Sequence, residues 1–272
     1  MTDDADDILQ RINTSARTSL DTLHAFAELD STNTWLLQQE SPLRGRFRAV
    51  IAEHQTAGRG RDGKIWLSAP ASGLCLSLAY TFAETPRNLP SLTLAIGVGL
   101  AVALGEIGVR DVALKWPNDL VAHDAKLGGI LTEVHSKGGK GHTVVVGVGL
   151  NVDLSNAMRY TAPASWTVRI TDLTECMGAP PIRAELAAAV IESLIDSVSR
   201  FERDGFGPFR SAWQNCDWLK GKTVRVQQSH GLINGIADGI DDDGALLIRT
   251  DTGTERVISG SVEVPAYGAA CA

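Results

Sequence analysis

The fold of this chain is decided by the stretch Gly58-Arg59-Gly60-Arg61-Asp62-Gly63-Lys64 and by the residues on its C-terminal side. The stretch matches G-x-G-x-x-G, which binds dinucleotide phosphates when a helix begins at its last glycines. Residues 65–73 instead contain a proline and small residues without a helical apolar period, and residues 74–80 are typical of a buried strand. Because residues 47–53 also predict a strand, the glycines lie in a strand-to-strand loop. The sequence therefore argues against a dinucleotide-binding fold.

The same loop carries three cations, Arg59, Arg61 and Lys64. Glycines let the backbone approach a ligand closely, and guanidinium groups match carboxylate and phosphate oxygens in pairs. Taken alone, the loop fits an anion-binding site and a solvated basic hairpin equally well. Since neighbouring cations repel one another, an anion-binding loop is expected to be mobile until its ligand arrives.

Composition narrows the class of protein. A chain of 272 residues with 44% hydrophobic and 21% charged residues fits one large globular domain, or a medium one with a small one. The net charge of −7 argues against general nucleic-acid binding, so no DNA partner is expected. The acidic start is no signal peptide, and the longest apolar run, residues 92–104, is too short to span a bilayer. Four separated cysteines without a C-x-x-C pair suit free thiols. We expect a cytoplasmic protein without a membrane partner.

Periodicity predicts a mixed α+β part followed by a small β part. Residues 1–22 are polar and predict a short lead-in, and Ser31-Thr32-Asn33 predicts the start of a helix. Strands are expected over 47–53, 74–82 and 143–152, a hairpin within 112–134, and helices over 91–107 and 183–203. After Trp218, short segments alternate with period two between turn residues, which predicts a small β-barrel. The expected units are therefore residues 1–22, 23–217 and 218–272.

Four segments, in this order, resemble those of the biotin protein ligases. They are the Gly58–Gly63 loop, Lys115-Trp116-Pro117-Asn118-Asp119, Lys126-Leu127-Gly128-Gly129-Ile130-Leu131 and Gly147-Val148-Gly149-Leu150-Asn151-Val152. The Ser31-Thr32-Asn33 turn and the C-terminal β part complete the pattern, which covers nearly the whole chain. The resemblance implies an α+β catalytic domain over 23–217, related to class II aminoacyl-tRNA synthetases and lipoate ligases, and an SH3-like barrel over 218–272.

The resemblance also implies a two-step reaction. Biotin and ATP, with Mg²⁺, give biotinyl-5′-adenylate, which then acylates a lysine of the biotin carboxyl carrier protein of an acyl-CoA carboxylase. Some members carry an N-terminal winged helix-turn-helix and act as repressors. Only thirty residues precede Ser31, too few for such a module, so a monofunctional ligase without a DNA-binding domain is expected.

Site residues are assigned from the matched motifs. Biotin contacts are expected from Ser31, Thr32, Asn33, Gln55, Arg59, Gly60, Arg61, Lys126, Gly128 and Gly129. Contacts with ATP or the adenylate are expected from Arg61, Trp66, Asn118, Asp119, Lys126 and Asn151. Lys126, Arg59 and Arg61 are the expected catalytic residues, because joining a carboxylate to a triphosphate requires positive charge. No metal-ligating residue is predicted, since phosphates and water supply most Mg²⁺ ligands.

Simpler roles remain open for several of these residues. Helix capping alone would account for Ser31 and Thr32. It is compatible with recognition of the ureido ring of biotin, because a neutral urea needs paired hydrogen-bond donors and acceptors. Trp66 fits a core position as well as an adenine contact, and Lys126 fits a solvated hairpin. For the whole chain, the alternatives are a lipoate or octanoate ligase or transferase, a DNA-binding repressor that senses biotin, and a non-catalytic binding protein.

Overall fold

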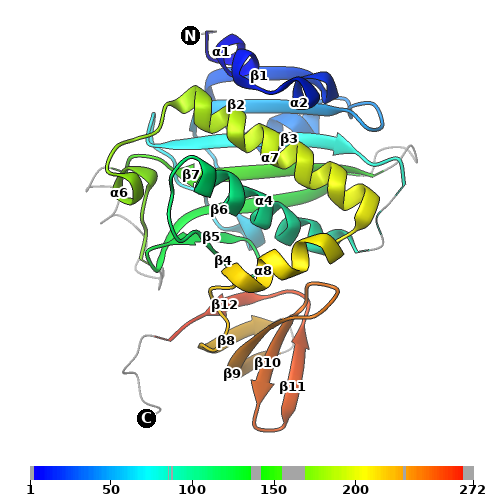
Figure 1. The fold of residues 1–272 in the computed structure, drawn as a ribbon, viewed down its shortest axis with the longest axis vertical. Coiled ribbons are helices and arrows are strands. Elements are labelled where there is room, and N and C mark those ends of the chain that lie inside the picture. The colour runs from blue at the N-terminus through cyan, green and yellow to red at the C-terminus, as the bar shows by residue number, and fades with distance from the viewer. Residues whose placement is uncertain are drawn as a thin grey trace.

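A computed structural model of the chain contains a seven-stranded sheet and a five-stranded sheet, placed one after the other along the long axis (Figure 1). It describes residues 3–84, 86, 88–135, 142–154, 169–228 and 231–265. The large sheet carries helices on its faces, and the small sheet is entirely antiparallel. The predicted α+β class, with a small C-terminal β unit, is confirmed.

The large sheet has the strand order β1-β2-β3-β7-β6-β5-β4. Its strands are β1 (Leu20–Leu29), β2 (Phe47–Gln55), β3 (Gly73–Thr81), β4 (Ala113–Lys115), β5 (Asp119–Ala122), β6 (Ala125–His135) and β7 (Thr143–Asn151). β1 and β2 are parallel, and the other neighbours are antiparallel. β3 is buried at every residue and pairs with β7 along its whole length, so these two strands form the centre of the sheet.

One face of this sheet is covered by α4 (Leu92–Glu106), α7 (Arg183–Asp204) and α8 (Arg210–Cys216), as Figure 1 shows. Among the described residues, the segment Leu89–Glu106, which adds the short helix η2 (Leu89–Ser91) to α4, is long and apolar enough to cross a membrane. More than half of it is buried inside the fold, which is typical of a core helix. A Cβ on Gly99 would lie 2.1 Å from Ser197 Oγ, so a larger residue there would require Ser197 or the two helices to move.

The opposite face carries α3 (Thr32–Gln38), which packs on β2, β3 and β7. Its Leu36 lies against Val50, Ala79 and Val145. The helix begins where expected, with Ser31 Oγ accepting a hydrogen bond from the Thr34 N–H at 3.4 Å. The start of α3 is thereby held over the middle of the sheet.

Residues 3–19 differ from the expected lead-in, because they form α1 (Asp3–Arg11) and α2 (Thr14–Ser19). Ile8, Ile12 and Ala16 are buried in the main core, where α1 packs against α7. The expected division after residue 22 falls inside β1. Apolar residues spaced along two short polar helices give too weak a period to be recognised. The short helices α6 (Leu173–Met177), η3 (Gly207–Phe209) and α8 also had no counterpart in the sequence prediction.

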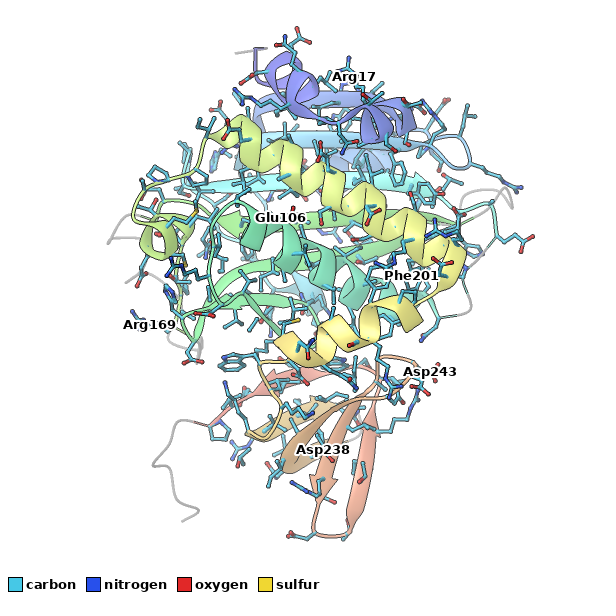
Figure 2. All side chains as sticks on the ribbon, viewed as in Figure 1. Arg17, Glu106, Arg169, Phe201, Asp238 and Asp243 are labelled. Atoms are coloured by element: carbon cyan, nitrogen blue, oxygen red, sulfur yellow. The ribbon has the colours of Figure 1, made fainter. Side chains whose placement is uncertain are left out.

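The small sheet has the order β11-β10-β9-β8-β12. Its strands are β8 (Thr223–Gln228), β9 (Gly231–Ile240), β10 (Leu246–Thr250), β11 (Gly253–Val257) and β12 (Ser261–Glu263). Its buried residues belong to the same hydrophobic cluster as those of the large sheet. Two hydrogen bonds join the units at the turn that carries Asp243 (Figure 2): Trp116 Nε1 to the Gly244 carbonyl at 3.0 Å and Asn88 Nδ2 to the Asp243 carbonyl at 2.5 Å.

Candidate active site

A cavity of about 600 Å³ lies where the two units meet. Its wall is built from the start of α3, the end of β2, the loop over residues 59–67, the turn over 115–119, strands β6 and β7, and residues 260–263 next to and within β12. Segments between residues 31 and 149 therefore form one site together with residues 260–263. The expected ligand contacts that line it are Ser31, Thr32, Asn33, Gln55, Arg59, Gly60, Arg61, Trp66, Asn118, Asp119, Lys126 and Gly129.

Uncharged hydrogen-bonding groups form one part of the wall. Gln55 Oε1 accepts from the Thr32 N–H at 2.8 Å and from Thr32 Oγ1 at 3.0 Å. Ser77 Oγ, fully buried in β3, lies 2.7 Å from Thr32 Oγ1 and 2.6 Å from Asn33 Oδ1. These bonds fix the Gln55 carboxamide and the Thr32 hydroxyl in one orientation. Such a rigid, neutral set of donors and acceptors suits an uncharged polar ligand.

Arg59 is already paired in this structure. Its Nη2 donates to Glu133 Oε1 at 2.6 Å, and Glu133 Oε2 accepts from Asn33 Nδ2 at 2.9 Å. Glu133 thus connects the glycine loop to the start of α3. An anion entering here meets an arginine whose charge is largely balanced by this carboxylate.

A second part of the wall is cationic. Lys126 Nζ lies 2.7 Å from Asp119 Oδ1, and Lys115 Nζ lies 4.0 Å from Asp119 Oδ2. Lys126 also stands 5.8 Å from the centre of the Trp66 ring. Burial lowers the pKa of Lys115; Asp119 opposes this shift, whereas Lys126 and Lys64 lower the pKa further. Two ammonium groups therefore share one carboxylate.

The backbone of Lys126 is clamped from the side away from the cavity. Its N–H donates to the Arg169 carbonyl at 2.7 Å, and its carbonyl accepts from the Thr171 N–H at 3.0 Å. Asn151 Nδ2 reaches the same Lys126 carbonyl at 3.3 Å and the Thr171 carbonyl at 3.0 Å. These bonds set the direction in which the Lys126 side chain leaves its strand.

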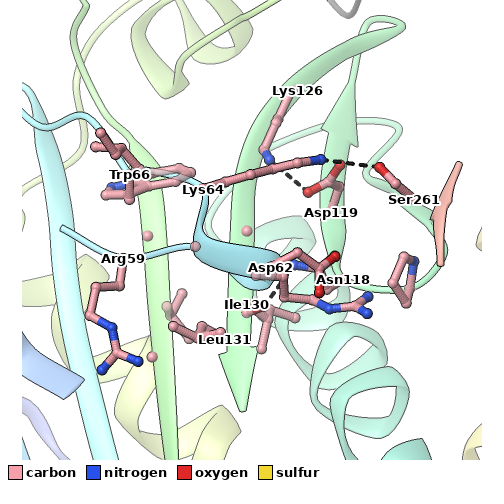
Figure 3. Close-up of a pocket in the computed structure, with 18 of the residues that line it drawn as sticks. Arg59, Asp62, Lys64, Trp66, Asn118, Asp119, Lys126, Ile130, Leu131 and Ser261 are labelled. Atoms are coloured by element: carbon pink, nitrogen blue, oxygen red, sulfur yellow. Dashed lines mark hydrogen bonds and ion pairs between the residues drawn. The ribbon is translucent and has the colours of Figure 1, made fainter. Parts of the chain in front are cut away.

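The glycine loop folds over the cavity as a closed turn. Gly60 donates to the Lys64 carbonyl at 2.7 Å and Trp66 donates to the Gly58 carbonyl at 3.0 Å, on either side of the short helix η1 (Arg61–Gly63). At the tip, Lys64 Nζ donates to Ser261 Oγ at 3.1 Å. Figure 3 shows Lys64 reaching Ser261 on one side of the cavity, with Arg59 on the other. The loop spans the site and contacts the C-terminal unit.

Two glycines of β7 make room for site side chains. A Cβ on Gly147 would lie 2.4 Å from Asn33 Oδ1, and one on Gly149 would lie 2.4 Å from Trp66 Cε2. Because alternate residues of a strand share a face, both glycines open the same face of the sheet. The sequence Gly147-Val148-Gly149 thus forms a floor on which the α3 start and the Trp66 ring rest.

Comparisons with known proteins match this architecture. Residues 25–151 match the biotin/lipoate A/B protein ligase family, and residues 220–264 match the biotin protein ligase C terminal domain. The biotin–[acetyl-CoA-carboxylase] ligase of Mycobacterium tuberculosis is 32% identical over 247 residues, covering 88% of each chain. The chain belongs to the biotin protein ligase family.

Two further relatives agree with this membership. The bifunctional ligase/repressor BirA of Escherichia coli is 36% identical over 223 residues, which are 82% of this chain and 68% of that protein. The structure of biotin protein ligase from Aquifex aeolicus in complex with biotin and ATP is 30% identical, with a TM-score of 0.77, covering 90% of this chain and 100% of that one.

Two expected contacts of this biotin protein ligase family member lie outside the cavity wall. A Cβ on Gly128 would point at the Gly149 carbonyl and Leu150, on the face opposite to that of Gly129. The amide of Asn151 is engaged with the backbone at residues 126 and 171. In this geometry Gly128 is a packing residue, and Asn151 acts on the site through Lys126.

The polar residues of the site that were not anticipated include Ser77, Lys115 and Glu133. Ser77 is the one polar residue in the buried run Leu74-Cys75-Leu76-Ser77-Leu78, which is itself a signal of a hydrogen-bonding role. Lys115 and Asp119 flank a predicted turn, and the register of β4 and β5 places them opposite each other. Glu133 gave no local signal, because its partner Arg59 comes from a distant loop.

Proposed function

We propose that this chain joins biotin to ATP and transfers the biotinyl group to a lysine of a biotin carboxyl carrier protein. The observation that carries the proposal is the combination of two environments in one cavity. A fixed neutral set around Thr32 and Gln55 suits the ureido ring, and a cationic set around Lys126 suits a carboxylate and phosphates. A protein that only binds biotin has no need of the second set.

In the first step, a carboxylate oxygen of biotin attacks the α-phosphorus of ATP. The bond from this phosphorus to the oxygen bridging the β-phosphate breaks, and pyrophosphate leaves with the electron pair. Lys126 and Arg61 line the same cavity, and we assign Lys126 to the biotin carboxylate and the α-phosphate. Both neutralise charge that would otherwise keep the two anions apart.

In the second step, the neutral amine of the acceptor lysine attacks the acyl carbon of biotinyl-5′-adenylate. The bond from carbon to the AMP oxygen breaks, AMP leaves with the electron pair, and the amine loses a proton as the amide forms. The loop over residues 59–67 lines the cavity, and its closure over the adenylate would exclude water and protect the labile anhydride until the acceptor arrives.

Mg²⁺ fits this site as a companion of ATP. Among the described residues there is no cluster of three or more His, Cys, Asp or Glu side chains able to hold a metal, and Asp119 is the carboxylate beside the lysines. Mg²⁺ needs only one or two carboxylates when phosphates and water complete its shell. Bound with ATP, it would neutralise phosphate charge next to Asp119.

Pyrophosphate exchange into ATP tests the proposal, run in parallel with biotin, lipoate and octanoate. Exchange that depends on biotin alone is expected. Exchange with lipoate or octanoate instead would mean that the protein activates a different acid by the same chemistry. Absence of exchange with all three acids would favour a binding protein.

The acceptor and the absence of a DNA partner are tested separately. Incubation with a purified biotin carboxyl carrier domain, biotin and ATP should produce a biotinylated lysine detectable by mass spectrometry. The Escherichia coli relative is named as a repressor as well as a ligase. A gel shift with DNA tests whether this chain also binds DNA. We propose that residues 3–217 form the catalytic unit, because α1 and α2 belong to its core, and that residues 218–265 form a unit that completes its wall.

A further inference from the structure

Lys115 is a buried cation for which the steps above have no role. Lys115 is only 7% exposed, yet it lines the cavity. It ends β4 and stands opposite Asp119 in the β4–β5 register. Lysine is rarely buried without a close anionic partner, because removing an ammonium group from water is costly.

The charges around Lys115 do not balance it. Its nearest carboxylate, Asp119, lies 4.0 Å away and is engaged by Lys126 at 2.7 Å. Lys64 and Lys126 both act on Lys115 as like charges, and Glu263 acts on it as a second opposite charge beside Asp119. The pocket beside Asp119 therefore keeps an excess of positive charge, as expected of a site completed by an anionic ligand.

We propose that Lys115 binds the phosphates of ATP that leave as pyrophosphate. The inference rests on the proposed function, and it gives the two lysines of the Asp119 pair different tasks. Lys126 contacts the carboxylate and the α-phosphate, which remain in the adenylate. Lys115 contacts the β- and γ-phosphates, and it stabilises the negative charge that the leaving oxygen gains as its bond to the α-phosphorus breaks.

The residues that follow Lys115 are held by hydrogen bonds in which its ammonium group takes no part. The neighbouring Trp116 is anchored independently, through its Nε1 bond to the Gly244 carbonyl. The turn after it is held by Asn118, whose Nδ2 donates to the Ile130 carbonyl at 2.8 Å and whose carbonyl accepts from the Ile130 N–H at 2.9 Å. A methionine at position 115 would keep the aliphatic stem and remove only the charge.

The test compares Lys115→Met with the wild-type protein in two measurements. Biotin-dependent exchange reports formation of the adenylate, and calorimetric titration with biotinyl-5′-AMP reports binding of a ligand that lacks the β- and γ-phosphates. We expect kcat/KM for ATP to fall on the order of 100-fold, with affinity for biotinyl-5′-AMP within about threefold of wild type, roughly the scatter of a weak contact. Lys222→Met is the matched control, because Lys222 stacks on Trp218 outside the cavity wall. It should leave both measurements unchanged.

Folding is checked by thermal unfolding, where Lys115→Met should be at least as stable as the wild-type protein. Should that variant fail to fold, Lys115→Gln provides the same comparison. Equal losses in exchange and in adenylate affinity would overturn the proposal, because they indicate a general structural role. Unchanged exchange would also overturn it. Wild-type protein without biotin-dependent exchange would count against the proposed function itself, which separates the two failures.

Discussion

Gly149→Ala is the substitution that most directly tests the geometry of the site. The added methyl carbon would lie 2.4 Å from Trp66 Cε2, whereas ordinary van der Waals contact begins near 3.4 Å. The indole ring must therefore move by about 1 Å, or the strand must bend. Since β7 is paired on both sides, by β3 and β6, the ring is the part that yields.

Moving this ring displaces the loop that holds it. The backbone N–H of Trp66 donates a hydrogen bond to the Gly58 carbonyl, so Arg59 and Arg61 in the same loop shift as well. Overpacking of this kind costs about 1–3 kcal/mol, and a displacement of about 1 Å in a catalytic group lowers rates on the order of 100-fold. We expect Gly149→Ala to reduce biotin-dependent exchange by that factor and to lower the free energy of unfolding.

Urea unfolding and pyrophosphate exchange measure the two effects. Gly105→Ala is the control, because a Cβ there meets nothing within 4 Å on helix α4. It should raise stability by about 0.5–1 kcal/mol and leave exchange unchanged. Adding Gly149→Ala to a Trp66→Ala background should cost little stability, since the ring is gone. An equal cost in both backgrounds would refute the contact as the cause.

Three further substitutions probe other parts of the structure. Ser77→Ala removes a buried hydroxyl beside Thr32, at a cost of about 1.5 kcal/mol. In the exchange assay, the KM for biotin should therefore rise roughly tenfold, while the KM for ATP stays constant. An equal rise in both KM values would contradict a role of Ser77 on the biotin side of the cavity. Lys64→Ala removes the bond from the loop tip to Ser261, and release of biotinyl-5′-adenylate, measured by dilution and filtration, should become faster; unchanged release would show that the bond does not hold the loop closed. The third substitution is Asp217→Asn. In the wild-type protein, burial raises the pKa of the Asp217 carboxyl, so the folded protein holds this proton more tightly than the unfolded chain does. The stability that comes from this proton is lost as the pH rises through the folded-state pKa. Urea unfolding should show the variant more stable than wild type at pH 7, with the gain shrinking at pH 4; a gain independent of pH would be incompatible with this cause.

The central strands were predictable because their residues repeat one signal over many positions. The β-branched run of β7 and the apolar run of β3 are long, and the apolar positions of α7 recur with a helical period. β1 was not recognised, because it lies at the edge of the sheet and all but one of its residues are exposed or only partly buried. Its polar and apolar positions consequently do not alternate.

The site was predictable where a motif names a loop or a turn, and less so where a side chain's direction matters. Gly128 and Gly129 are adjacent, and strand alternation allows only one of them to face the cavity. The pair of Arg59 and Glu133 joins residues 74 positions apart and depends on how the loop folds over the sheet. Contacts of this kind arise from the tertiary arrangement and leave no trace in local sequence.

The wall of the cavity includes both Ser31 and Ser261. The cavity can therefore be completed only late in the synthesis of the chain. A ribosome releases the first of these residues long before the last, so a growing chain carries half of a binding site while the other half has not been translated. The large sheet has all its strands by residue 151, but the loop at Lys64 gains its contact with Ser261 only after residue 261 emerges. The ability to hold a reactive anhydride is therefore expected to arise late, once residue 261 has left the exit tunnel.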